Sequence, residues 1–133
     1  GEGHVHAFAG ENWGEVVWRM LVKIIHGNVH LNFHSKDGNR YLVSFAEDGI
    51  NVTRNPQSAM GKGMGTSGIR HALGEWHVVE IGLQKDLFYV AVDGYLEIEQ
   101  TEPDPLPPGG IWLEVLDDSE VLFDEIFVCK PGA

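Results

Sequence analysis

The feature that most constrains this chain is a period-two alternation of apolar and polar residues, repeated in short segments. The segment His30-Leu31-Asn32-Phe33-His34 shows it clearly. Its Leu and Phe side chains share one side, and its Asn and two His side chains share the other. Successive side chains of an extended chain point to opposite faces, so this pattern predicts half-buried β-strands.

Further segments with strand-like patterns are separated by Gly, Asn, Asp and Pro turns. The strands we predict cover residues 16–25, 30–34, 41–45, 50–54, 76–83, 87–92, 95–100, 111–116 and 121–128. Asp93-Gly94 is a strong two-residue hairpin signal. No convincing helical period is present. Short strands at this density favour an all-β fold, an antiparallel two-sheet β-sandwich of the jelly-roll kind.

Two stretches are predicted as connections. Residues 60–65 are rich in Gly and Met, which indicates a mobile loop. They lack the Gly-Lys-Ser/Thr ending of a phosphate-binding loop. Residues 102–110 hold several prolines and are expected to form a stiff crossover.

Composition narrows the possible partners. The 133 residues are 43% hydrophobic, enough for one domain over residues 1–133 with a real core. Lys and Arg total 9 against 20 Asp and Glu, a net charge of −11. This charge disfavours nucleic acid and anionic lipid, and no apolar stretch is long enough to span a membrane. The single Cys129 permits no internal disulfide and is expected in the core.

Several runs resemble known sandwich domains. Residues 74–81 (GEWHVVEI) and 90–94 (VAVDG) resemble the "WHxVxI…VxVDG" hairpin of laminin-G-like sandwiches. Residues 105–111 (PLPPGGI) and 121–128 (VLFDEIFV) resemble the ending "PLPxGGIxLE…FDDIxV". That ending is found in 3-keto-disaccharide-hydrolase-like and related carbohydrate-binding domains.

A third run, residues 27–33 (GNVHLNF) with Arg40 and Tyr41, is similar to "GxVHLNFR…RY" of the same domains. The resemblance covers most of the chain and implies a concanavalin-like jelly roll. Where that family often carries arginine after "NF", this chain has His34. Histidine offers fewer donors than a guanidinium, and its charge depends on pH.

Alternation predicts which side chains leave the core. In residues 111–116, Trp112, Glu114 and Leu116 are expected outside, together with the polar residues of 30–34. An exposed aromatic ring beside carboxylate and amide groups suits the apolar face and the hydroxyls of a sugar. The predicted ligand-binding residues are Trp112, Glu114, His30, Asn32, His34, Arg40 and Arg19.

Each of these residues could instead have a purely structural role. The proline crossover could cover Trp112, and Glu114 and the histidines could be ordinary surface residues. Trp13, Trp18 and Trp76 are expected to pack, and Asp93 is expected in a turn.

Two kinds of metal site are conceivable. His4 with His6, or His30 with His34, could ligate a transition metal, because each pair shares one face of a strand. A structural Ca²⁺ is implied by related sandwiches, with Asp124 and main-chain oxygens near Glu2 as candidate ligands.

These observations favour a non-catalytic carbohydrate-binding module for a neutral glycan, within a larger secreted multidomain protein, extracellular or at the cell surface. We expect a bacterial source and a polysaccharide ligand. One alternative is a 3-keto-glycoside hydrolase-like enzyme using Glu114 with His30 or His34. The other is a protein-interaction or structural sandwich domain.

Overall fold

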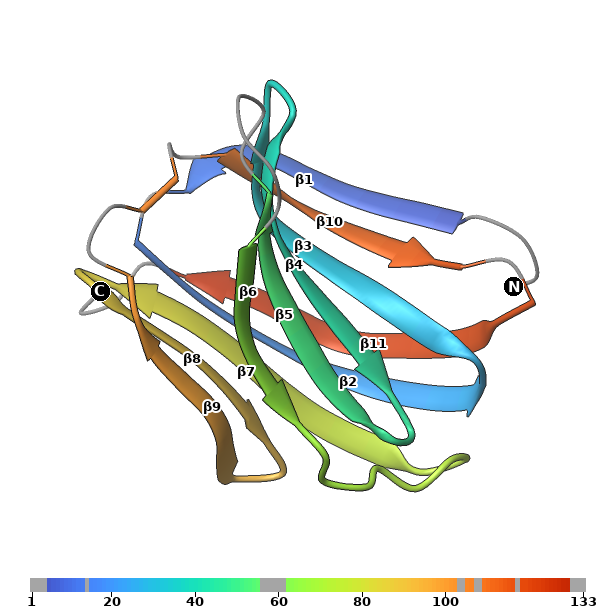
Figure 1. Cartoon of the computed structure of the whole chain (residues 1–133). Helices are drawn as coiled ribbons and strands as arrows, with labels where there is room; N and C mark the ends of the chain where they lie inside the picture. The colour runs from blue at the N-terminus through green and yellow to red at the C-terminus, as the bar shows by residue number, and fades with distance from the viewer. Residues whose placement is uncertain are drawn as a thin grey trace.

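The computed structural model describes residues 5–13, 15–55, 62–102, 105–106, 109–116 and 118–129. In these ranges the chain forms strands joined by turns and loops (Figure 1). The strands are β1 (Val5–Trp13), β2 (Val16–His26), β3 (Asn28–Lys36), β4 (Asn39–Ala46), β5 (Gly49–Asn55), β6 (Lys62–Ser67), β7 (Trp76–Gln84), β8 (Leu87–Val92), β9 (Tyr95–Thr101), β10 (Gly109–Val115) and β11 (Glu120–Cys129). No helix in this part of the chain is long and apolar enough to cross a membrane.

The strands form two antiparallel sheets that face each other (Figure 1). In the described part of the chain, one sheet has six strands in the order β1-β10-β3-β4-β5-β6, and the other has five in the order β11-β2-β7-β8-β9. The chain passes repeatedly from one sheet to the other, as a jelly roll requires. The predicted all-β, two-sheet antiparallel sandwich is therefore confirmed.

The core lies between the sheets and is built from the inward half of each alternating strand. Strand β2 alternates along most of its length, with Trp18 and Val22 fully buried. Across the core, Phe33 stacks on Phe88 with ring centroids 5.7 Å apart, and within its own sheet it stacks on Tyr41 with centroids 4.9 Å apart. Aromatic contacts of this kind add to the burial of apolar area, so these rings join the two sheets firmly.

Two strands were not predicted, because their local sequences are weak strand formers. Strand β1 contains Ala, Gly, Glu and Asn, and strand β6 contains two glycines. Each is held by pairing along its length, β1 with β10 and β6 with β5. Predicting residues 60–65 as a loop was thus wrong from Lys62 onward, where the pairing to β5 and the burial of Met64 override propensity.

The predictions for individual aromatic and turn residues have different outcomes. Trp18 packs in the core, and Asp93 lies in the β8–β9 turn with a φ of 52°, so both predictions are confirmed. The prediction that Trp76 packs in the core is wrong, because the residue is 44% exposed and the Lys23 ammonium lies 5.7 Å from its ring centroid. The side chains of Trp13 and Cys129 lie outside the described part of the structure.

Candidate functional site

The outer face of the six-stranded sheet carries two rows of side chains that run across the strands. Antiparallel pairing places opposite residues on the same face, so the register defines each row. The first row includes Glu114, His30, Ser44, Asn51 and Thr66, and the register continues it from Glu114 to His6 on β1. The second row, one pleat further on, consists of Trp112, Asn32, Leu42 and Thr53.

Glu114 lies on β10 and is held by two basic side chains. Its Oε1 is 3.4 Å from His30 Nδ1 and 3.9 Å from Arg40 Nη1. The Glu114 side chain is only 12% exposed, whereas that of Arg40 is 34% exposed. The carboxylate is thus fixed in position, with a partly exposed guanidinium beside it.

Asn32 connects this group to the backbone of β10. Its Nδ2 donates to the Trp112 carbonyl over 3.2 Å, and its Oδ1 accepts from Arg40 Nη1 over 3.2 Å. Asn32 faces outward by register, but it is fully buried. Its role in the site is therefore to orient Arg40 from below.

Alternation correctly places the side chains of β10. Ile111, Leu113 and Val115 are buried, while Trp112 and Glu114 are half-buried on the outer face. Five of the seven predicted ligand-binding residues are thus brought together, namely Trp112, Glu114, His30, Asn32 and Arg40.

His34 does not belong to this face, and its predicted exposure is wrong. The β3–β4 register shifts between Phe33 and Lys36, and His34 has a φ of 51°. This bulge turns the ring inward, where it is 2% exposed and its Nδ1 lies 2.9 Å from the Leu106 carbonyl. The break in alternation at a bulge is the physical reason for the error. Arg40, from the neighbouring strand, supplies the guanidinium of the site instead.

Arg19 is also misplaced by the prediction, because β2 belongs to the other sheet. Its guanidinium forms an ion pair with Glu80 at 2.8 Å, and Glu80 Oε2 accepts from the Tyr89 hydroxyl. Burial would raise the pKa of Glu80, but the hydrogen bonds from Tyr89 and Arg19 outweigh it and lower that pKa. Arg19 therefore acts in a surface ion pair remote from Trp112.

The described residues contain no cluster of side chains that supports the predicted metal sites. No group of three or more His, Cys, Asp or Glu side chains there is arranged to hold an ion. Asp124 is exposed on β11, where its Oδ1 accepts from the Glu125 amide over 2.8 Å. Glu2 and His4 lie outside the described residues, as does the side chain of His6. The Ca²⁺ site stays a prediction.

A hollow of about 240 Å³ lies at the β6 end of the first row. Its outward-facing walls are formed by Asn28, Ser44, Asn51 and Thr66, with Asp48 at the β4–β5 turn. Sequence reasoning missed it because β6, which carries Thr66, was not predicted. The outer face therefore combines a charged group near Trp112 with a mainly neutral polar hollow.

Together the fold and this face define a jelly-roll β-sandwich with rows of polar side chains across one sheet and a hollow at the β6 end of these rows. No protein-family model and no curated protein sequence matches the chain. Solved structures do match. A carbohydrate-binding module CBM66 from Bacillus subtilis has a TM-score of 0.73 at 16% identity, over 96% of this chain and 83% of that one.

Two further structures have the same fold. A Bacillus subtilis protein of unknown function with a galectin-like fold has a TM-score of 0.80 at 11% identity, over 97% of this chain and 78% of that chain. Sheep galectin-11, in complex with glycerol, has a TM-score of 0.72 at 9% identity, over 92% and 96%. At such identities the likeness establishes the shared fold. The predicted resemblance to carbohydrate-binding sandwiches is confirmed at that level.

Proposed function

We propose that this domain is a non-catalytic carbohydrate-binding module that holds a neutral glycan across the outer face of the six-stranded sheet. The observation that carries the proposal is the group formed by Glu114, His30, Asn32 and Arg40 beside Trp112. It sets a guanidinium, a carboxylate and an aromatic side chain on one rigid surface. Adjacent sugar hydroxyls suit such paired donors and acceptors, and the apolar ring face of a sugar suits tryptophan.

The length of the first row favours an oligosaccharide over a single sugar. From Glu114 on β10 to Thr66 on β6 the row crosses four gaps between strands. At about 4.8 Å per gap this spans roughly 19 Å, enough for several linked units. The hollow at Asn51 and Thr66 offers neutral hydrogen-bonding groups for the far end of such a chain. The net charge of −11 further disfavours an acidic ligand.

The same geometry argues for binding without catalysis. Most glycosidases place two carboxylates across the scissile bond. Among the described members of the two rows, Glu114 is the single carboxylate, and His30 and Arg40 already engage it. A carboxylate held in this way is suited to fixing a hydroxyl.

The test is a glycan array followed by calorimetry, with variants matched between the two sheets. Trp112→Ala and Arg40→Ala should each weaken binding at least tenfold, about 1.4 kcal/mol. Trp76→Ala and Arg19→Ala make the same chemical changes on the opposite sheet and should leave binding unchanged. A glycan whose affinity survives Trp112→Ala would remove the proposed site. Turnover of a 3-keto-glycoside that is lost in Glu114→Gln would replace binding with catalysis.

The cellular setting belongs to this proposal as well. A polysaccharide-binding role suits an extracellular or cell-surface location and a larger secreted multidomain parent. Protease-protection of the parent protein on intact cells would test it, since an internal location leaves the domain uncleaved.

A further inference from the structure

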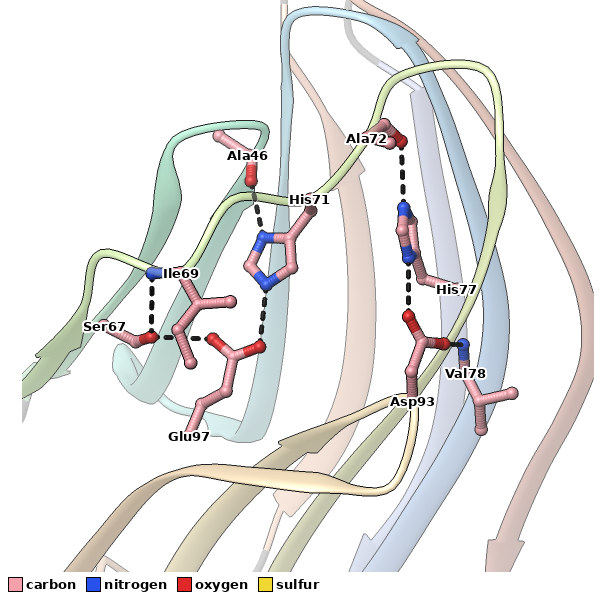
Figure 2. A network of polar contacts seen from close by, with 9 residues as sticks. All are labelled: Ala46, Ser67, Ile69, His71, Ala72, His77, Val78, Asp93 and Glu97. Atoms are coloured by element: carbon pink, nitrogen blue, oxygen red, sulfur yellow. Dashed lines mark hydrogen bonds and ion pairs between the residues drawn. The ribbon is translucent and has the colours of Figure 1, made fainter.

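Two buried histidines close one end of the sandwich, next to the hollow at the far end of the proposed glycan site. The segment 68–75 leads from β6 in one sheet to β7 in the other. His71 lies on this segment and His77 is the second residue of β7, and they are 3% and 7% exposed. Figure 2 shows each ring held between a main-chain carbonyl and a carboxylate. The rings are 5.9 Å apart, and His71 stacks on Phe45 with centroids 4.6 Å apart.

The His71 ring has an acceptor oxygen at each nitrogen. Its Nδ1 lies 2.9 Å from the Ala46 carbonyl, and its Nε2 lies 2.8 Å from Glu97 Oε2. Glu97 Oε1 in turn accepts from the Ser67 hydroxyl over 2.7 Å. A carbonyl only accepts, so Nδ1 must donate to it. The contact between His71 Nε2 and Glu97 Oε2 then needs a second proton, which either His71 Nε2 or the Glu97 carboxyl group carries.

The His77 ring is placed in the same way. Its Nε2 lies 2.9 Å from the Ala72 carbonyl, and its Nδ1 lies 2.8 Å from Asp93 Oδ2. Asp93 Oδ1 accepts from the Val78 amide, which fixes the carboxylate. Burial lowers the pKa of His77, but the bonds to Asp93 and Ala72 and the charges of Asp93 and Glu75 outweigh it, so the pKa is raised above 6.5.

This cluster is continuous with the hollow of the outer face. Ala46 and Ser67 both line the hollow, and they are also direct partners of His71 and Glu97. The segment itself is tied down by two main-chain bonds, from the His71 amide to the Glu47 carbonyl and from the Gly74 amide to the Ile24 carbonyl, each 2.8 Å. We therefore expect a loosening of segment 68–75 to change the shape of the hollow.

We propose that the His71–Glu97 and His77–Asp93 pairs form a proton-held clamp that fixes segment 68–75 to both sheets and shapes the hollow for its ligand. The effect on the ligand rests on the proposed glycan binding, whereas the clamp itself does not. The other charged or titratable groups around the two rings are Arg70 and Glu75 of the segment, Glu47 of the β4–β5 turn and Tyr95 of β9. Arg70 is paired with Glu47 at 3.0 Å on the surface.

The sign of the pH effect follows from the raised pKa of His77. A group with a higher pKa in the closed form stabilises that form fully below its open-form pKa, about 6.5. The stabilisation is lost as pH rises through the closed-form pKa, because the neutral imidazole has a single N–H and can donate to only one of its two acceptors, Asp93 or the Ala72 carbonyl. We expect the clamp to hold in mildly acidic solution and to release at higher pH.

Nuclear magnetic resonance of the ligand-free protein tests the clamp directly. Titration of the His77 ring nitrogens should give a midpoint above 6.5. Over the same pH range, the hydrogen-exchange protection factors of the His71 and Gly74 amides should fall, about tenfold for each pKa unit that separates the closed and open forms. Protection factors that stay constant through the titration of His77 would overturn the proposal.

Asp93→Asn is the informative variant, and His26→Gln is its control. Asparagine tolerates the positive φ of Asp93 and keeps an acceptor for the Val78 amide, so the turn is preserved. It removes the carboxylate charge, so the His77 midpoint should fall and the two amides should lose protection already at pH near 6. His26 is exposed at the end of β2, and its substitution should change neither. An unchanged His77 midpoint in Asp93→Asn would refute the clamp.

A separate binding measurement tests the link to the hollow. If a glycan is found, its affinity should decrease as His77 titrates, and Asp93→Asn should bind weakly at pH near 6. His30 lies in the proposed glycan site as well, but Asp93→Asn leaves His30 unaltered, so an effect of this variant is assigned to the clamp. Absence of any glycan ligand would count against the proposed function, while titration and exchange still decide the clamp. Affinity that is insensitive to Asp93→Asn would remove the link to the hollow.

Discussion

Asn32→Ala removes the side chain that orients the proposed glycan site, and its cost can be worked out from the structure. Asn32 is fully buried and makes two hydrogen bonds, one to the Arg40 guanidinium and one to the Trp112 carbonyl. A bond to a charged group contributes about 1.5–3 kcal/mol, and a neutral one contributes about 1 kcal/mol. Arg40 is 34% exposed, so the charged bond belongs at the lower end. We expect a loss of roughly 2–3 kcal/mol in the free energy of unfolding.

Urea unfolding followed by circular dichroism measures this loss, with Thr53→Ala as control. Thr53 lies in the same row two strands away, and its hydroxyl accepts one neutral hydrogen bond, from the Asn55 side-chain amide over 2.8 Å, so its loss should cost about 1 kcal/mol. Binding should weaken in Asn32→Ala at a temperature where the protein is still folded, because Arg40 is no longer oriented. A change in unfolding free energy below about 1 kcal/mol, with glycan affinity intact, would refute the positioning role.

Two further predictions concern buried contacts. Tyr41→Phe should destabilise the fold by about 2–4 kcal/mol, because the buried hydroxyl donates to Glu102 and accepts from the Leu106 amide, each over 2.8 Å. Thermal unfolding would show it, and a variant as stable as the parent would contradict the loss of these two bonds. Gly82→Ala should cost about 1–3 kcal/mol, because an added Cβ would meet the Tyr89 ring at 2.2 Å. Chemical unfolding would measure this, and a neutral effect would mean that the Tyr89 ring moves aside freely.

Much of the fold could be predicted from local sequence. Alternation identifies β2, β3 and β10 because each buries one face against the core, and the strand period is fixed by backbone geometry. The pair Asp93-Gly94 marks the β8–β9 turn because both residues adopt a positive φ there. The outward direction of Trp112 and Glu114 follows from the same period. These are properties of short segments, which need no knowledge of their neighbours.

Only the tertiary structure decides which outward faces meet. Arg40 joins the site and Arg19 does not, because their strands enter different sheets. The bulge that turns His34 inward depends on its pairing with β4, and alternation cannot anticipate it. His71 and Glu97 are 26 residues apart and form a buried pair only through sheet closure. Sequence alone thus determined most of the strands and most of the side chains that face the core, whereas strand order and register determined the polar rows of the outer face and the two histidine–carboxylate pairs.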